Sequence, residues 1–219
     1  MNLTTIEGTF LEECSNRFLC KVLINNKIEE CYVPSSSKLS NYIKLKNKKV
    51  LLTTNINPKA RTKYSLFAVK YYNKYIMLNL NIVNKLLLNH LINSDTLSYK
   101  VEHRIGNYKC DIFFPDENHI VEAKGIICTT KSCIFPLVSS DRSISQLKEI
   151  SNLLTQGYKV SYYLVSLSPI VKSINLDESH EFTKLIKECL NLGMNLSAFK
   201  IEYINNIFSF SALKITGII

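Results

Sequence analysis

The sequence has no run of roughly 18 apolar residues, so it contains no candidate membrane-spanning helix. It also lacks internal repeats and low-complexity linkers. None of its seven cysteines forms a CxxC pair, so we expect free thiols in a reducing cytoplasm rather than disulfides or a zinc site. The first residues include acids and no basic segment, unlike a secretory signal. These absences favour a cytoplasmic globular protein, and 219 residues suffice for one large domain or two small ones.

Positive charge is concentrated in the first third of the chain. Residues 1–80 contain 13 Lys and Arg against 5 Asp and Glu, whereas residues 81–219 contain 14 against 13, which gives net charges of +8 and +1. This asymmetry favours a polyanionic partner, DNA or RNA. A biased Asn-, Ile- and Lys-rich composition would explain many lysines on a solvated surface, but it does not explain their concentration.

The first 80 residues have the pattern of short strands without a convincing helix. Five or six strands in this length predict a small β-barrel, with the OB-fold as the leading candidate for a domain at residues 1–80. The basic segment between the third and fourth strands has room for one helical turn. The predicted strands span 5–13, 17–25, 28–33, 49–54, 64–71 and 75–80.

From residue 81 onward, helices alternate with strands. Apolar residues at helical spacing predict helices over about 82–91, 140–157 and 177–193. Apolar, β-branched runs predict strands at 159–167 and 196–204. This alternation predicts an α/β domain at residues 81–219 whose mixed sheet is covered by helices on both faces. The fold class is therefore α+β or α/β.

The segment "KCDIFFPDENHIVEAKG" predicts a β-hairpin. Residues 115–118 have good turn chemistry because proline fixes φ and Asp and Asn bond their own backbone. A four-residue loop there pairs residues 112–114 with residues 119–121. It then places Asp111 opposite Glu122, with Cβ atoms roughly 4.5–5.5 Å apart. Two carboxylates at that distance repel one another unless a cation compensates them.

A divalent cation is one such compensation, because Mg²⁺ prefers oxygen ligands and is commonly held by one or two carboxylates with water and phosphate. Lys124 shares the face of Glu122, and the register places Lys109 opposite Lys124. An amine there could position or deprotonate water, or stabilise charge on a phosphate. Metal, carboxylates and lysine together indicate phosphodiester hydrolysis with Mg²⁺ or Mn²⁺. The alternative is a pair of exposed acids that Lys124 neutralises.

Asp111 followed by Glu122-Ala123-Lys124 on a hairpin resembles the PD-(D/E)xK nuclease superfamily. The whole chain resembles the sugar fermentation stimulation protein A (SfsA) family. Six segments in the family's order carry this resemblance: Arg17-Phe18-Leu19, 33–39, 57–69, the asparagines at 79 and 84, 135–142, and 190–203.

The resemblance implies an N-terminal OB-fold joined to a nuclease-like α/β domain, DNA binding, and a historical role in regulating sugar (maltose) metabolism genes. By motif match, Asp111, Glu122 and Lys124 take the catalytic positions. Asp111, Glu122 and the backbone carbonyl of Ala123 are then the implied metal ligands. Glu102 is a further candidate ligand, and otherwise a surface acid paired with a neighbouring arginine at 104.

Three departures from the family pattern keep the enzymatic activity open. Asn89 stands where the first helix often carries a glutamate, Ser145 and Gln146 replace a Lys-His pair, and residues 166–167 replace Gln-Arg. The protein is thus either a metal-dependent nuclease for DNA or RNA, or a nucleic-acid-binding regulator with a weak or inactive site. A fold used only for protein contacts is a third possibility. The four histidines have no ligand or triad spacing.

Basic residues of both parts are candidate phosphate contacts. We expect Tyr64 and Phe67, which follow the basic 59–63 segment, to belong to the barrel core rather than to stack on bases. The candidate nucleic-acid-binding residues are Arg17, Lys38, Lys59, Arg61, Lys63 and Arg142.

Overall fold

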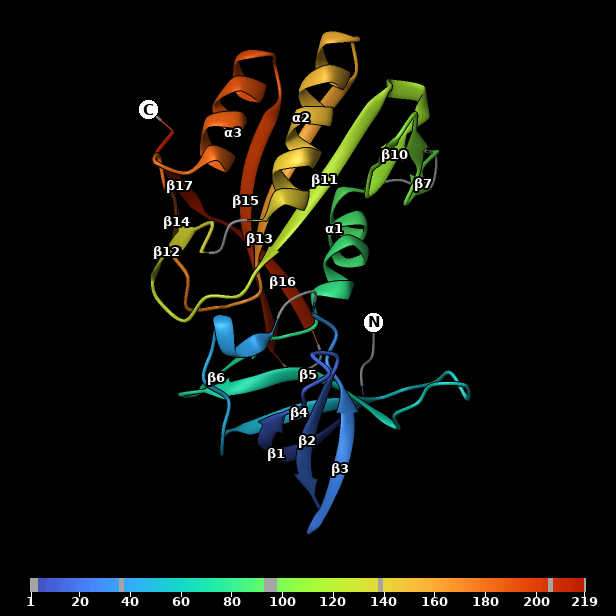
Figure 1. Cartoon of the computed structure of the whole chain (residues 1–219), viewed down its shortest axis with the longest axis vertical. Helices are drawn as coiled ribbons and strands as arrows, with labels where there is room; N and C mark the ends of the chain where they lie inside the picture. Colours follow the sequence, from blue (N-terminus) through green and yellow to red (C-terminus); the bar gives the residue numbers. More distant parts are fainter. Residues whose placement is uncertain (1–3, 36–37, 93–97, 138–139, 205–206, 219) are drawn as a thin grey trace.

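The first part of the chain forms a β-barrel, drawn in the lower half of Figure 1. Its strand order is β3-β2-β1-β4-β5-β6, and a parallel pairing of β3 with β5 closes the ring. The barrel confirms the predicted OB-fold, and a single 3-10 turn at Leu39–Asn41 is the expected helical turn. The strands are β1 (Thr5–Glu13), β2 (Leu19–Ile24), β3 (Lys27–Tyr32), β4 (Lys49–Thr54), β5 (Tyr64–Tyr71) and β6 (Lys74–Met77). This computed structural model describes residues 4–35, 38–92, 98–137, 140–204 and 207–218.

The barrel interior is filled by alternate residues of its strands, and β5 is buried on both faces. The first six residues of β5 are buried because one face of the strand points into the barrel and the other packs on the second part of the chain, where Phe67 contacts Tyr203 and Phe208. Tyr64 and Phe67 are 8% and 1% exposed. The expectation that these two rings belong to the core is confirmed, so neither is available to a ligand.

The second part is built on a mixed sheet of order β16-β15-β13-β11-β10-β7. Strands β11, β13 and β15 are parallel, and the outer strands β16, β10 and β7 run antiparallel to their neighbours. The strands are β7 (Lys100–Val101), β10 (Ile112–Phe114), β11 (His119–Ile126), β13 (Lys159–Ser166), β15 (Asn195–Ile204) and β16 (Ile207–Ala212).

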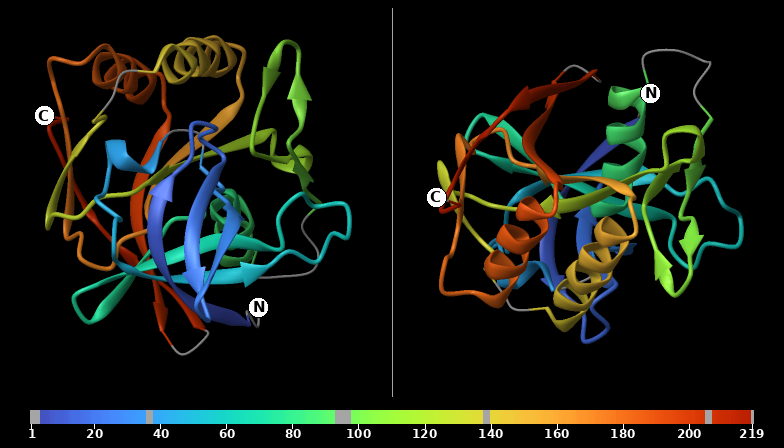
Figure 2. Two further views of the ribbon diagram at one scale, coloured as in Figure 1. Left: turned by 60° about the horizontal axis from the view of Figure 1, so that its bottom comes forward. Right: turned by 90° about the horizontal axis from the view of Figure 1, so that it is seen from above.

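Helices cover both faces of this sheet, as predicted. The view from above in Figure 2 shows α2 and α3 side by side on one face and α1 on the other. Leu87 and Leu88 of α1 pack on Val121, whereas Leu147 of α2 and Phe182 of α3 pack on the opposite face. None of the helices in the described parts of the chain has the length and apolar character needed to span a bilayer. The helices are α1 (Val83–Leu91), α2 (Asp141–Thr155) and α3 (Glu181–Asn191).

Five short strands outside the mixed sheet complete the second part, and the sequence pattern indicated neither these five nor β16 of the mixed sheet. Strands β12 (Ser132–Phe135), β14 (Ser173–Leu176) and β17 (Lys214–Thr216) form a small parallel sheet. Strands β8 (Arg104–Ile105) and β9 (Tyr108–Lys109) form a separate hairpin. At two to four residues each, these strands are too short to display a clear alternation.

The barrel and the mixed sheet share a hydrophobic core. The barrel's core cluster continues into Val83 of α1 and into residues of β13 and β15, among them Tyr203, whose ring meets Phe67 edge-on with centroids 5.0 Å apart. A backbone hydrogen bond of 3.0 Å also joins the amide of Met77 to the carbonyl of Leu167. The two halves therefore pack as one body.

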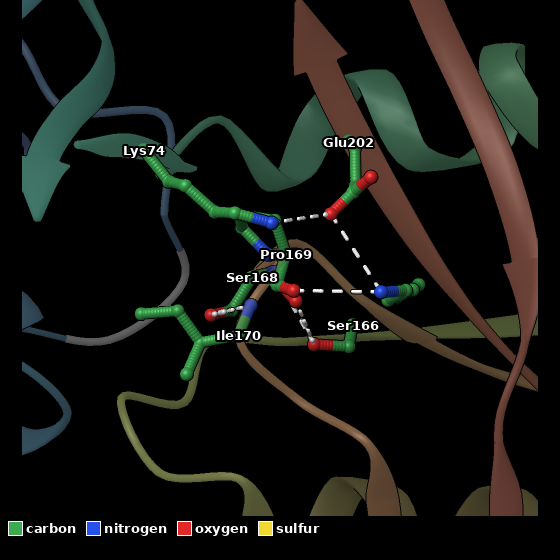
Figure 3. Close-up of polar contacts among 7 residues, drawn as sticks. Lys74, Ser166, Ser168, Pro169, Ile170 and Glu202 are labelled. Atoms are coloured by element: carbon green, nitrogen blue, oxygen red, sulfur yellow. Dashed lines mark hydrogen bonds and ion pairs between the residues drawn. The ribbon is translucent and has the colours of Figure 1, made fainter.

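Polar contacts reinforce this junction (Figure 3). Glu202 of β15 accepts from Lys74 of β6 at 3.2 Å and lies 3.6 Å from Lys200 on its own strand. Lys200 also donates to the carbonyl of Pro169 at 3.5 Å. The Glu202 carboxylate, 18% exposed, thus bridges lysines from the barrel and the sheet.

Candidate functional site

The hairpin of β10 and β11 has the register that its turn predicts. Ile112 pairs with Val121, and the next two residues of β10 pair in step toward the turn. The connection is a 3-10 turn, Pro115–Glu117, followed by Asn118 in the left-handed region at φ 51°. The predicted four-residue loop is confirmed. Asp111, one residue before β10, therefore lies beside Glu122.

The predicted opposition of Lys109 and Lys124 is wrong. The ladder with β11 ends at Ile112, and Lys109 pairs instead with Arg104 in the β8–β9 hairpin. The turn of that hairpin contains Gly106 at φ 58°, a conformation that glycine adopts without steric cost. A tight local turn thus redirects the chain before it reaches the longer hairpin.

Glu102 is paired with this lysine rather than with the arginine at 104. Its Oε2 lies 2.7 Å from Lys109 Nζ, and this hydrogen bond lowers the pKa of Glu102. The amide of Glu102 also donates to the carbonyl of Asp111 at 2.8 Å. Glu102 thus lies near the site, but its carboxylate binds a lysine.

Two donors hold the Asp111 carboxylate. Asn84 Nδ2 of α1 donates to Oδ1 at 2.7 Å, and the Ala123 amide donates to Oδ2 at 2.9 Å. Burial raises the pKa of Asp111, and these two hydrogen bonds act against the rise. Gly125 brings α1 close enough, because a Cβ there would lie 2.6 Å from Leu80 Cδ2, just before the helix.

Glu122 is almost completely buried, with 5% of its surface exposed. Tyr108 donates its hydroxyl to Oε2 at 2.6 Å, and Gln146 Nε2 of α2 donates to Oε1 at 3.2 Å. Burial and, next, the negative charge of Asp111 raise the pKa of Glu122 to about 8. Without a cation, this carboxyl therefore binds a proton at neutral pH.

Lys124 extends toward the N-terminal end of α2. Its Nζ donates to Ser143 Oγ at 2.9 Å. Burial and, next, the nearby charge of Arg142 lower the pKa of Lys124. Ser140 caps the start of the helix by accepting from the Ser143 amide at 3.4 Å. Lys124 of β11 and Arg142 of α2 thus lie together at the N-terminal end of α2.

A cavity of about 450 Å³ opens over these groups. Asp111, Lys124 and Arg142 line it, as do Tyr42 from the barrel's β3–β4 connection and His180 at the start of α3. The carboxylate at 122 does not line the cavity and lies behind it. A ligand in this cavity would therefore contact both halves of the chain.

Sequence reasoning missed four residues of this site: Asn84, Tyr108, Ser143 and Gln146. The sequence presents Asn84 only as part of a family segment, and Gln146 only as the loss of a basic residue. Asn89, the position compared with the family's helical glutamate, is exposed and does not line the cavity. The α1 side chain that reaches the site is thus Asn84.

The basic candidates fall into separate groups. Lys59, Arg61 and Lys63 are exposed on the β4–β5 connection, where the chain forms turns and bends. Arg17 is exposed on the β1–β2 connection. Arg142 lines the cavity described above, and Lys38 is exposed directly before the 3-10 turn at 39–41. The family segments 33–39 and 135–142 include residues 36–37 and 138–139, which lie outside the described residues.

Comparison with known protein families shows to which family this chain is related. The family described as "SfsA N-terminal OB domain" matches residues 14–78, and "Sugar fermentation stimulation protein RE domain" matches residues 77–206. The chain belongs to the sugar fermentation stimulation protein (SfsA) family. SfsA-family relatives match along nearly their whole length.

One of these relatives is the sugar fermentation stimulation protein homolog of Thermosipho melanesiensis, which is 25% identical over 94% of this chain and 93% of the relative. The homolog of Thermotoga maritima is 27% identical over 90% and 88%. Among solved structures, Pyrococcus furiosus SfsA in complex with Ca²⁺ matches with a TM-score of 0.79 at 20% identity, covering 98% of this chain and 99% of that one. At that identity the structural match shows the shared fold.

Proposed function

We propose that this SfsA-family protein binds nucleic acid and hydrolyses phosphodiester bonds at a site formed by Asp111, Glu122 and Lys124 with a divalent cation, as in PD-(D/E)xK nucleases. The observation that carries the proposal is the meeting of two carboxylates and an amine beside one cavity, where the charge of Asp111 helps to raise the pKa of Glu122. Perturbed titrating groups that gather in a cleft are typical of catalytic sites.

The residues present fit a hard cation such as Mg²⁺ or Mn²⁺. Each carboxylate has about four acceptor positions, and the hydrogen bonds described above occupy only part of them. No cluster of three carboxylate, imidazole or thiol ligands occurs among the described residues. Asp111, Glu122 and the Ala123 carbonyl would therefore share the ion with water and phosphate, the usual mode for Mg²⁺. A relative of the same fold, Pyrococcus furiosus SfsA, is described in complex with Ca²⁺, which agrees with a divalent-ion site in this family.

The chain's own residues have separable roles. A bound divalent ion would polarise a phosphoryl oxygen and lower the pKa of its water. Lys124, whose amine has a lowered pKa, is suited to orient or deprotonate the attacking water. Arg142 is exposed at the cavity and is suited to hold a phosphate oxygen through charge-assisted hydrogen bonds.

A second candidate is a DNA-binding regulator of sugar metabolism genes whose nuclease-like site is weak or inactive. The hydrogen bond between Glu122 and Gln146 favours it, because a neutral amide stands where the family has a basic residue and cannot neutralise a phosphate. The sugar fermentation names of the relatives agree with this candidate.

The test compares the parent with Asp111→Asn. Labelled single- and double-stranded DNA and RNA are incubated with Mg²⁺, Mn²⁺ or EDTA, and thermal melts are recorded under the same conditions. The parent should cleave and gain stability with metal, because an ion that binds only the folded state stabilises it. Asp111→Asn should lose both effects and still bind nucleic acid.

Asp116→Asn is the matched control, since it removes an exposed acid from the same hairpin and should behave as the parent. Equal metal-dependent stabilisation and cleavage in the parent and Asp111→Asn would contradict the proposal. Metal-dependent stabilisation without cleavage would favour the regulator instead.

A further inference from the structure

A second groove, of about 470 Å³, lies on the barrel between two connections. Phe18 and Tyr32 line one side, from the end of the β1–β2 connection and the end of β3. Ile56, Asn57 and Arg61 line the other side, from the β4–β5 connection, which projects from the barrel at the right of Figure 1. Its volume is within the usual range for small-ligand sites, about 300–1,000 Å³.

The groove exposes apolar and aromatic side chains to solvent. The Phe18 ring is 38% exposed, and Ile56 is 96% exposed. The Phe18 and Tyr32 rings are stacked, with centroids 6.5 Å apart and planes 19° from parallel. Contiguous exposed apolar and aromatic surface with polar residues at its rim is typical of a binding site.

Hydrogen bonds hold the backbone that carries the Phe18 ring in place. The Phe18 amide donates to Asn16 Oδ1 at 3.1 Å, and its carbonyl accepts from the Val33 amide at 2.8 Å. On the facing connection, Asn55 Nδ2 donates to the Thr62 carbonyl at 2.7 Å. A preorganised groove loses less conformational entropy on binding.

The charge around the groove is positive. The Arg17 guanidinium lies over the Phe18 ring, 4.7 Å from its centroid. Arg61 reaches Glu30 at 3.4 Å, but both side chains are well exposed, and such pairs contribute little. Lys59 and Lys63 stand exposed on the same connection, within a first third whose net charge is +8. An anionic, flat, apolar-faced ligand complements this surface.

We infer that the groove between Phe18, Tyr32 and the β4–β5 connection binds an unpaired nucleobase of single-stranded nucleic acid by stacking. This inference rests on the proposed function and names its substrate form. Bases within a duplex cannot offer their faces to a side chain, whereas unpaired bases stack on aromatic rings with little dependence on sequence. Arg17 and Arg61 then contact the flanking phosphates, and the exposed cation–π contact of Arg17 is weak enough to yield to a base.

The test uses the absence of tryptophan from the chain. Phe18→Trp introduces a single indole, whose fluorescence a stacked base should quench. The ligands are a 20-nucleotide oligothymidylate, its RNA counterpart, the same-length duplex, and an abasic strand that keeps the phosphates. All titrations contain EDTA, so that cleavage does not interfere. We expect quenching by both single strands, and little by the duplex or the abasic strand.

Phe18→Ala should weaken single-strand binding roughly 5- to 150-fold, since base stacking contributes about 1–3 kcal/mol per base. The salt dependence should not change, because every phosphate-binding side chain remains in place. Tyr72→Ala removes another exposed aromatic, 85% exposed at the β5–β6 turn, and should have no effect.

The inference is overturned if Phe18→Ala binds single strands as tightly as the parent, or if the abasic strand quenches Phe18→Trp as strongly as oligothymidylate. In either case salt-dependent binding by the parent would leave the proposed function intact. Absence of all nucleic-acid binding by the parent would overturn both.

Discussion

Glu122→Gln should change the pH dependence of folding stability in the metal-free protein. In the folded chain Glu122 is 5% exposed, and burial together with the Asp111 charge raises its pKa from 4.5 to about 8. Glutamine keeps the shape of the protonated acid and can still accept from the Tyr108 hydroxyl. The amide of Gln146 can turn so that its oxygen accepts instead. The substitution thus removes the titration while keeping the packing.

The sign follows from proton binding. Because its folded-state pKa is raised, Glu122 contributes stability that is fully present below pH 4.5 and lost as the pH rises through 8. Between these limits the folded chain holds one more proton than the unfolded chain. The free energy of unfolding should therefore fall by about 1.4 kcal/mol per pH unit from this group alone, on the order of 3 kcal/mol between pH 6 and pH 8.

The assay is urea denaturation followed by circular dichroism at pH 6, 7 and 8 in EDTA. Asp111 and Lys124 also have shifted pKa values and interact with Glu122, so the comparison of the parent with Glu122→Gln measures Glu122 together with its coupling to these two groups. The free energy of unfolding of Glu122→Gln should increase steadily relative to that of the parent as the pH rises. Glu149→Gln, an exposed acid of α2, is the control and should follow the parent.

Millimolar Mn²⁺ at pH 8 should restore stability to the parent, because a cation compensates the ionised pair. Mn²⁺ should stabilise Glu122→Gln much less than the parent. The same loss of stability with pH in the parent and Glu122→Gln would refute the reasoning, since it would mean that this carboxyl is not held protonated by burial and by Asp111.

Two other predictions concern the basic surface and the junction. Changing Lys59, Arg61 and Lys63 to Ala should reduce the magnitude of the log–log salt slope of nucleic-acid binding by ~0.7–0.9 for each phosphate that is no longer neutralised. It should leave metal-induced stabilisation unchanged, and an unaltered slope would mean that these side chains are only solvated surface. Glu202→Gln should lower the free energy of unfolding by about 1–2 kcal/mol, because two lysines then face each other without a carboxylate. Lys74→Met should lower the free energy of unfolding by less than Glu202→Gln does. Equal losses for the two variants in urea denaturation would contradict a bridging role for Glu202.

Features that depend on neighbours along the chain can be predicted from the sequence alone. The β10–β11 register follows from the turn at residues 115–118, because proline and the Asx residues restrict the backbone locally. The barrel strands follow from β-rich apolar runs, and α2 follows from apolar residues at helical spacing over about 140–157. Asp111 and Glu122 can therefore be placed side by side without any knowledge of packing.

Partners that lie far apart in sequence are set by the packing of the folded chain. Asn84 reaches Asp111 across 27 positions and Gln146 reaches Glu122 across 24, because α1 and α2 dock on opposite faces of one sheet. No periodicity encodes such meetings. They depend on how every element packs against the rest, including the core that the barrel shares with β13 and β15. The electrostatics of the site also depend on the packing of the folded chain. The pKa of Glu122 is raised first by burial, which exists only once the chain has folded.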